Sequence, residues 1–253
     1  MSISSAQPTM KTRGCYIWAM PPIIALFDID GTLLRAGGAG RRAVELALAD
    51  VLDDLDGPVS LESVEFAGRT DPWIVRTALT QYGVTADDGL IREVLRRYVA
   101  HLPRELEIAT AFEVLPGVLS LLAELSARDD VILGLGTGNT EGAAYAKLAR
   151  GELDSFFSFG GFGSDHSDRA ELLRAGLERG LERIGARADR ADVVVIGDTP
   201  YDVAAAQAIG AHCVAVSTGG YDGPALEAAG ATVVVSDLSA AAVRSAFKRS
   251  AAG

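Results

Sequence analysis

Residues 23–33 read IIALFDIDGTL: five apolar residues in succession, then two aspartates separated by one isoleucine, then a glycine. The apolar run is too short for a helix and is typical of a strand buried on both faces, as in a parallel sheet. Because side chains two positions apart in an extended chain point to the same side, Asp28 and Asp30 are expected to lie together. They follow the carboxyl end of the strand, where open α/β sheets bind their ligands.

Further apolar runs have the same character, and helical patterns separate them. The runs are 131–135, 193–196, 213–216 and 232–235; the helical patterns cover about 117–127, 168–184 and 202–209, with an alanine-rich helix starting near residue 237. Alternating strands and helices predict an α/β fold with a doubly wound parallel sheet.

One interval, residues 36–112, breaks the alternation. It holds no convincing strand run, and helical patterns dominate it at 41–52, 72–82 and 87–101. We therefore predict a helical cap domain, 36–112, inserted after the first strand, with hinges at 37–38 and near 115–117. The α/β catalytic core then comprises residues 21–35 and 113–253.

Composition and charge limit the classes of partner. The chain has 253 residues, 49% of them hydrophobic, and a formal net charge of −11. A surface this acidic repels nucleic acid and anionic lipid, so we expect no nucleic-acid partner and no membrane partner. Cys15 and Cys213 are the two cysteines. In a chain that needs no covalent crosslinks they read as ordinary thiols in a reducing compartment.

The N-terminus superficially resembles a signal peptide, because Lys11 and Arg13 precede an apolar stretch at 15–27. Two prolines interrupt this stretch, and it ends in Asp28 without a small-residue cleavage site. No apolar run reaches the roughly 18 residues of a membrane helix. We therefore expect a cytoplasmic protein in which residues 1–20 form a disordered extension and Met20 is a candidate start.

A second acidic motif ends the stretch 193–202, which reads VVVIGDTPYD. Again a buried strand ends in glycine and aspartate, here Asp198. Asp202 alone would read equally well as the N-cap of the following helix, but beside the first motif it reads better as part of an acidic site. Like charges this close need a cation to stay ionised, and oxygen ligands without histidine or cysteine favour Mg²⁺.

Two weaker features could bind an anion. The segment 136–139, GTGN, follows the second core strand. A small hydroxyl and backbone N–H groups at a helix start can cradle a phosphate, although the same residues suit any tight turn. Arg169 supplies a cation that would offset phosphate charge. The alternative for Arg169 is a solvated surface side chain.

These motifs, in this order over residues 22–236, resemble the haloacid dehalogenase superfamily, in its branch of phosphoglycolate phosphatases and related small-molecule phosphatases. The DxDGTL motif at 28–33 and the GDTPxD motif at 197–202 are highly specific together. The resemblance implies a Rossmann-like core with an inserted cap. It also implies a phosphatase that hydrolyses a small phosphate monoester, phosphoglycolate-like or a sugar phosphate, through an aspartyl phosphate.

The same resemblance implies roles for individual residues. Asp28 would be the nucleophile, Asp30 the general acid and base, and Thr137 a ligand of the phosphoryl group. Mg²⁺ would be held by Asp28, by the backbone carbonyl of Asp30 and by Asp198, with Asp202 supporting the site from outside the ligand set. The implied substrate-binding residues are Thr137, Gly138, Asn139 and Arg69.

The sequence departs from the family pattern at the basic residue that lies between the GTGN segment and the GDTPxD motif. This residue is usually lysine in this branch, and the matching residue here is Arg169. Arginine keeps the charge but differs from lysine in length and in its forked, planar donor group. The nearest competitor for this role is Lys147, in a helical pattern that starts at Thr140. We expect Lys147 to face solvent.

In the cap, Asp71 followed by Pro72 reads as a helix start, which explains both residues without a functional role. This reading does not explain Arg69. Similar segments in the family face the active site, so Arg69 is a candidate contact for the far end of an acidic substrate.

Two other functions remain open at this stage. A phosphosugar mutase of the same superfamily would use the same two aspartates. A non-catalytic phosphate-binding or regulatory protein on this fold would be expected to have lost a motif carboxylate. The expected partner is a small phosphorylated metabolite, and the expected assembly is a monomer or homodimer.

Overall fold

The computed structural model describes residues 21–52, 57–185 and 191–247. The predicted extension at 1–20, the candidate start Met20 and Cys15 lie outside this range. Among the described residues, none of the helices combines the length and apolar character that a membrane span requires.

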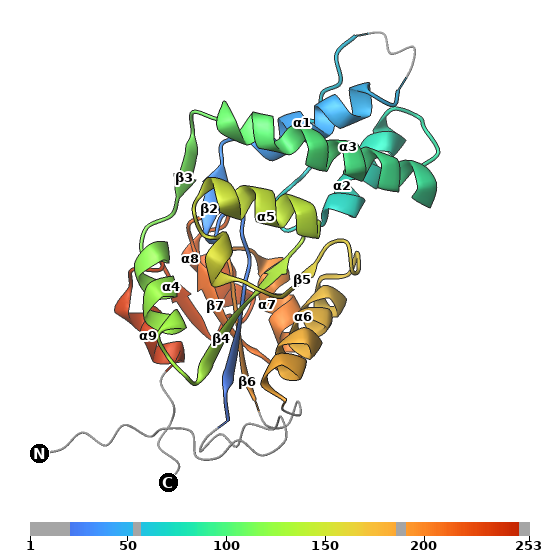
Figure 1. Ribbon diagram of the computed structural model, residues 1–253. Helices are drawn as coiled ribbons and strands as arrows, with labels where there is room; N and C mark the ends of the chain where they lie inside the picture. Colours follow the sequence, from blue (N-terminus) through green and yellow to red (C-terminus); the bar gives the residue numbers. More distant parts are fainter. Residues whose placement is uncertain (1–20, 53–56, 186–190, 248–253) are drawn as a thin grey trace, which may run out of the picture.

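A six-stranded sheet, parallel throughout, forms the centre of the molecule, with strand order β5-β4-β1-β6-β7-β8 (Figure 1). Its strands are β1 (Ile23–Phe27), β4 (Val131–Thr137), β5 (Gly160–Phe162), β6 (Asp192–Gly197), β7 (His212–Val216) and β8 (Val233–Val235). Each predicted apolar run is one of these strands, which confirms the α/β class. The sequence prediction missed β5, since two of its three residues are glycines with low strand propensity.

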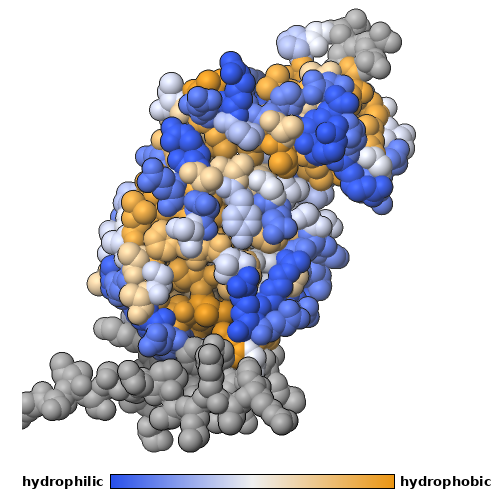
Figure 2. Space-filling model, in the orientation of Figure 1, coloured by the Kyte–Doolittle hydropathy of each residue, from blue (hydrophilic) through white to orange (hydrophobic). Residues whose placement is uncertain are grey.

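Both faces of the sheet are covered, as the uninterrupted apolar runs require. Alternate residues of β1 point to opposite sides: Ala25 and Phe27 belong to one buried cluster, and Ile24 and Leu26 to another. The first cluster includes residues of α4 (Val118–Ser126), α5 (Glu141–Arg150) and α9 (Ala241–Ala246). The second includes residues of α6 (Arg169–Ile184), α7 (Pro200–Ala208) and α8 (Gly223–Ala228). The outer face of α6 is hydrophilic (Figure 2), with Glu171, Glu178, Glu182 and Arg183 exposed.

Three helices fill most of the interval between β1 and β4: α1 (Ala39–Ala49), α2 (Asp71–Gln81) and α3 (Asp88–Glu107). They lie beyond the carboxyl ends of the strands (Figure 1) and share a separate buried cluster, to which α5 adds Ala143. The predicted end of the third helix, at residue 101, was wrong, because α3 continues through Pro103. The division into a cap at 36–112 and a core stays a prediction.

A short antiparallel ribbon joins these helices to the sheet. It consists of β2 (Leu34–Ala36) and β3 (Phe112–Val114), with Arg35 opposite Glu113. The chain enters and leaves the helical segment through this ribbon, which lies between the sheet and the helices (Figure 1). The two strands have three residues each. Such lengths carry too little periodic signal to be predicted from sequence.

Candidate active site

The register of the sheet brings the acidic motifs together. Phe27 at the end of β1 pairs with Leu135 of β4 and with Ile196 of β6. The residues that follow these positions, Asp28 and Asp198 among them, therefore emerge at one edge of the sheet. Carboxylate oxygens of Asp28, Asp198 and Asp202 lie within 4.8 Å of one another, and all three side chains are buried. The sequence-predicted convergence of acids at this edge thus corresponds to a compact cluster.

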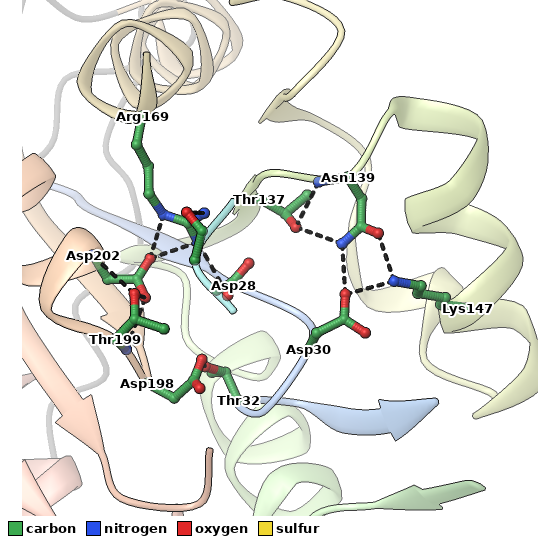
Figure 3. A network of polar contacts seen from close by, with 11 residues as sticks. Asp28, Asp30, Thr32, Thr137, Asn139, Lys147, Arg169, Asp198, Thr199 and Asp202 are labelled. Carbon is green, nitrogen blue, oxygen red and sulfur yellow. Dashed lines mark hydrogen bonds and ion pairs between the residues drawn. The ribbon is translucent and has the colours of Figure 1, made fainter. Parts of the chain in front are cut away.

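Arg169 lies against this cluster from the first turn of α6, whose N-cap is Asp168 (Figure 3). Its Nη2 is 3.1 Å from Asp28 Oδ2 and 2.6 Å from Asp202 Oδ1, and its Nε donates to the same Asp202 oxygen at 2.6 Å. The Arg169 side chain is 9% exposed. Arg169 is therefore not a solvated surface residue. The buried guanidinium of Arg169 contacts the buried carboxylates of both Asp28 and Asp202.

Asp202 has little capacity left for a further partner. Its Oδ1 accepts from Arg169, and its Oδ2 accepts from the backbone N–H and the hydroxyl of Thr199, at 3.0 Å and 2.7 Å, in a capping box that starts α7. The alternative interpretation of Asp202 as the N-cap of this helix was wrong, because Thr199 is the N-cap and Asp202, the third residue of the helix, completes the capping box. Asp202 also lies in the acidic cluster, as the other interpretation expected. A supporting role that holds Arg169 fits this bonding better than direct coordination of a cation.

The acidic cluster has the chemistry of a divalent-cation site. Burial, together with the charges of Asp28 and Asp202, raises the pKa of Asp198 to about 9. Burial raises the pKa of Asp28 to about 6, although Arg169 opposes this shift. One arginine thus does not balance these carboxylates, and oxygen ligands of this kind suit Mg²⁺.

The backbone around Asp198 is close enough to exclude other side chains. A Cβ atom at Gly31, where φ is +84°, would lie 2.4 Å from Asp198 Oδ2, and one at Gly219 would lie 1.7 Å from the same oxygen. Thr32 donates its hydroxyl to Asp198 Oδ1 at 3.2 Å. These glycines form a cradle around the carboxylate that any larger residue would fill. The residues present therefore fit a divalent cation such as Mg²⁺, and Asp28 and Asp198 are the candidate side-chain ligands.

Asp30 lies on the other side of Asp28, in a second polar group (Figure 3). Its Oδ2 accepts from Asn139 Nδ2 at 2.8 Å and from Lys147 Nζ at 2.6 Å. Asn139 also donates to Thr137 Oγ1 at 2.9 Å and accepts from Lys147 at 2.6 Å. The side chain of Asn139 thus has protein partners on both ends, whereas the Thr137 hydroxyl keeps its proton for another acceptor.

The expectation that Lys147 faces solvent was wrong. The residue is 5% exposed, on the side of α5 that faces the acidic motifs. The error arose because helical periodicity alone does not reveal where α5 lies relative to the loop after β1. Both basic candidates are therefore in the site: Arg169 contacts Asp28, and Lys147 contacts Asp30.

The helical segment reaches the site through the loop before α2. Gly138 accepts a hydrogen bond from the Asp71 backbone N–H at 2.8 Å, and Asp71 Oδ2 accepts from the Thr140 N–H at 2.7 Å. A Cβ at Gly138 would lie 2.3 Å from the carbonyl oxygen of Arg69, so glycine is needed for this approach. Burial raises the pKa of the Asp71 carboxyl to about 6.

Arg69 is held between two rings. Its guanidinium carbon is 4.5 Å from the ring centre of Trp73 and 4.7 Å from that of Tyr201, and it pairs with Glu65 at 2.6 Å. Trp73 follows the helix start, whereas Tyr201 belongs to α7. Arg69 lines the cavity described next, and its role as a substrate contact stays a prediction.

A cavity of about 400 Å³ lies between the strand ends and the helices. Asp28, Asp30, Thr137 and Asp198 line it from the sheet side. Its other charged lining residues are one further acid, Asp71, and five basic residues: Arg35, Arg41, Arg69, Lys147 and Arg169. The volume and the charge suit a small anionic ligand.

The sequence pointed to Lys147 only as a competitor for the role of Arg169, expected to face solvent, and it did not point to Tyr98. Tyr98 is 1% exposed, lines the cavity from α3, and makes no hydrogen bond to any residue that the structure describes. The one available signal was a lysine among small residues on α5, in the sequence AAYAKLA. An amphipathic pattern permits such a lysine on either face, so the signal is weak.

Comparison with known proteins identifies relatives over most of the chain. Residues 24–210 match the family described as haloacid dehalogenase-like hydrolase. A phosphoglycolate phosphatase of Rhodospirillum rubrum is 33% identical over 224 residues, which cover 86% of this chain and 88% of the relative. A phosphoglycolate phosphatase of Pseudomonas savastanoi is 30% identical over 222 residues, with 86% and 77% covered.

Solved structures agree with the fold. A hydrolase from Pseudomonas syringae superimposes with a TM-score of 0.60 at 24% identity, covering 87% of this chain and 95% of that one. CbbY from Rhodobacter sphaeroides, solved in complex with phosphate, superimposes with a TM-score of 0.60 at 20% identity, covering 87% and 96%. At these identities the likeness supports the arrangement of the elements alone.

Proposed function

Because the chain belongs to the haloacid dehalogenase-like hydrolases, in the phosphoglycolate phosphatase-like branch of phosphoric monoester hydrolases, we propose that it hydrolyses a small phosphate monoester through an aspartyl phosphate on Asp28. One observation carries this proposal. The Asp28 carboxylate lies between a buried cation, Arg169, and a second carboxylate group, Asp30, at the mouth of parallel strands. The proposed nucleophile, the cation that balances its charge and the proposed proton donor thus lie next to one another.

In the first step a carboxylate oxygen of Asp28 attacks phosphorus in line with the ester oxygen. The bond from phosphorus to the ester oxygen breaks, and Asp30 gives that oxygen a proton, so that a neutral alcohol leaves. Arg169 and the hydroxyl of Thr137 stabilise the negative charge on the phosphoryl oxygens. Positioning and charge balance supply most of the catalysis, because phosphoryl transfer asks little else of the protein.

In the second step water attacks the phosphorus of the aspartyl phosphate. Asp30, now a carboxylate, takes a proton from this water, the bond from phosphorus to the Asp28 oxygen breaks, and inorganic phosphate is released. The chain returns to its initial state. When bound by Asp28, Asp198 and the Asp30 carbonyl, Mg²⁺ would supply positive charge that neutralises the phosphoryl oxygens and the acidic cluster.

The cavity indicates the substrate class. It is small, at about 400 Å³, and three arginines, Arg35, Arg41 and Arg69, line it in addition to the two basic residues that contact Asp28 and Asp30. We infer a compact substrate with an acidic or strongly polar leaving group, of the phosphoglycolate kind or a small sugar phosphate. The phosphate release assay below also separates hydrolysis from phosphosugar mutase activity, since a mutase returns the phosphoryl group to sugar.

The test is a panel of phosphorylated metabolites assayed for inorganic phosphate with and without Mg²⁺. Phosphoglycolate should be among the best substrates, and Asp28→Asn should have no measurable turnover while remaining folded at the assay temperature. Substantial turnover by the pure, folded Asp28→Asn protein would sink the proposed mechanism. Binding of phosphorylated metabolites without any turnover would favour a regulatory protein on the same fold.

A further inference from the structure

Lys147 is a buried cation that the steps above do not use. Its side chain is 6% exposed, and its ammonium donates to Asp30 Oδ2 and to Asn139 Oδ1, both at 2.6 Å. Burying an ammonium group carries a cost of several kcal/mol unless good partners offset it. Lys147 lines the cavity next to Asp30, the side chain that exchanges protons in the proposed reaction.

The side chains of Asp30, Asn139 and Lys147 are hydrogen-bonded to one another in a triangle. Asn139 and Lys147 both donate to the same oxygen of Asp30, and they also bond to each other. Asp30 Oδ1 has no hydrogen bond from any residue that the structure describes. The side chain of Asp30 is 44% exposed, so without these two donors its rotamers would be free to exchange. The donors therefore fix one oxygen of the carboxylate and leave the other one free.

We propose that Lys147 is a positioning residue for Asp30: with Asn139 it holds Oδ2 so that Oδ1 is available to exchange a proton with the leaving oxygen and the attacking water. This proposal rests on the proposed function, in which Asp30 is the acid and base. The proposal gives the two buried cations of the site different roles, because Arg169 contacts the carboxylates of Asp28 and Asp202, whereas Lys147 contacts Asp30.

The division has a kinetic consequence. Loss of Lys147 should impair the proton transfer that Asp30 performs, while leaving the nucleophile and its cation in place. Alkyl phosphates need that proton for their poor leaving group, whereas an aryl phosphate with a good leaving group needs it much less. A purely structural defect would lower the rate for both esters alike, because it would disturb Asp28 as well.

The test is a double-mutant cycle with Lys147→Met, Asp30→Asn and the combined variant, measured as kcat/KM for phosphoglycolate and for p-nitrophenyl phosphate. Lys147→Met should lower the value for phosphoglycolate by roughly 10–100-fold, as a displaced catalytic group does, with a clearly smaller loss for the aryl ester. In the Asp30→Asn background the same substitution should have almost no effect, since residues that act as a unit are non-additive.

Arg150→Met is the matched control, because Arg150 is a basic residue of the same helix that contacts Phe112 and the Leu106 carbonyl outside the cavity. It should leave both kcat/KM values near wild type. If Lys147→Met does not fold, Lys147→Gln keeps an amide donor and should show a milder form of the same pattern.

The outcomes separate the two proposals. If Asp30→Asn retains the wild-type rate with phosphoglycolate, the acid and base assignment in the proposed function is wrong. If Asp30→Asn is impaired but Lys147→Met is equally costly in both backgrounds, the positioning role is wrong. Lys147 would then bind the substrate or support the fold directly. Equal losses for the alkyl and aryl esters would also overturn the positioning role.

Discussion

Replacing Arg169 by alanine removes a side chain that is 9% exposed and whose guanidinium contacts Asp28 and Asp202, with side chains 8% and 1% exposed. Breaking a buried ion pair in this way costs about 3–5 kcal/mol of stability. At roughly 2–4 °C per kcal/mol for a domain of this size, the melting temperature should fall by roughly 6–20 °C. This is an upper value, because the remaining carboxylates can take up protons.

The catalytic loss should be separable from the loss of stability. Arg169 is a preorganised cation next to the nucleophile, and removal of one such contact typically lowers kcat by about 10²–10³-fold. Arg169→Lys keeps the charge, but a single ammonium does not reproduce the contacts of both Nε and Nη2. The lysine variant should therefore be intermediate in rate, well above the alanine variant.

The assay is inorganic phosphate release at saturating substrate and Mg²⁺, at a temperature where circular dichroism shows each variant folded. Arg174→Ala is the matched control, because Arg174 is on the same helix, pairs with Glu171 and is 43% exposed. It should retain wild-type kcat. If Arg169→Ala retains near-normal kcat while folded, the assignment of Arg169 to the charge balance of the nucleophile is refuted.

Two further predictions use the acidic groups. Exhaustive chelation with EDTA should abolish turnover and added Mg²⁺ should restore it, whereas Ca²⁺ should substitute poorly because its contacts are longer and more numerous; activity that survives chelation would exclude a metal requirement. Burial raises the pKa of Asp71 from 3.8 to about 6, so the folded state binds the extra proton and the free energy of unfolding should fall by about 3 kcal/mol as pH rises from about 4 to 6. Asp71→Asn should flatten this part of the stability profile measured by urea denaturation, and an unchanged slope would mean that Asp71 does not titrate there.

The parts of the site that the sequence predicts are those governed by strand ends. Asp28 and Asp198 each follow an uninterrupted apolar run. Parallel strands bring the residues that follow them to the same edge of the sheet, whatever the packing of the surrounding helices. Arg169 was found because the resemblance fixes its place in the motif order. Its burial and its bonds to Asp28 and Asp202 could be known only from the packing of α6.

Packing between elements explains what the sequence did not predict. Lys147 reaches Asp30 because α5 follows β4 directly and lies beside the loop after β1, a relation that helical periodicity does not contain. The edge strand β5 is short and glycine-rich, and a Cβ at Gly161 would lie 1.7 Å from the Leu172 carbonyl oxygen. Glycine is required there by the approach of α6, which obscures the apolar signal of a strand.

The central claim is that Asp28 carries the phosphoryl group during turnover. The most direct measurement is an acid quench of the enzyme during steady-state turnover of a phosphate-labelled substrate, followed by peptide mapping with mass spectrometry. The account predicts a hydroxylamine-sensitive acyl phosphate on the peptide that contains Asp28, absent from Asp28→Asn and enriched in Asp30→Asn if the second step is slowed more than the first. Phosphate release at full rate with the label on a different residue, or with no covalent label in any quenched sample, would contradict it.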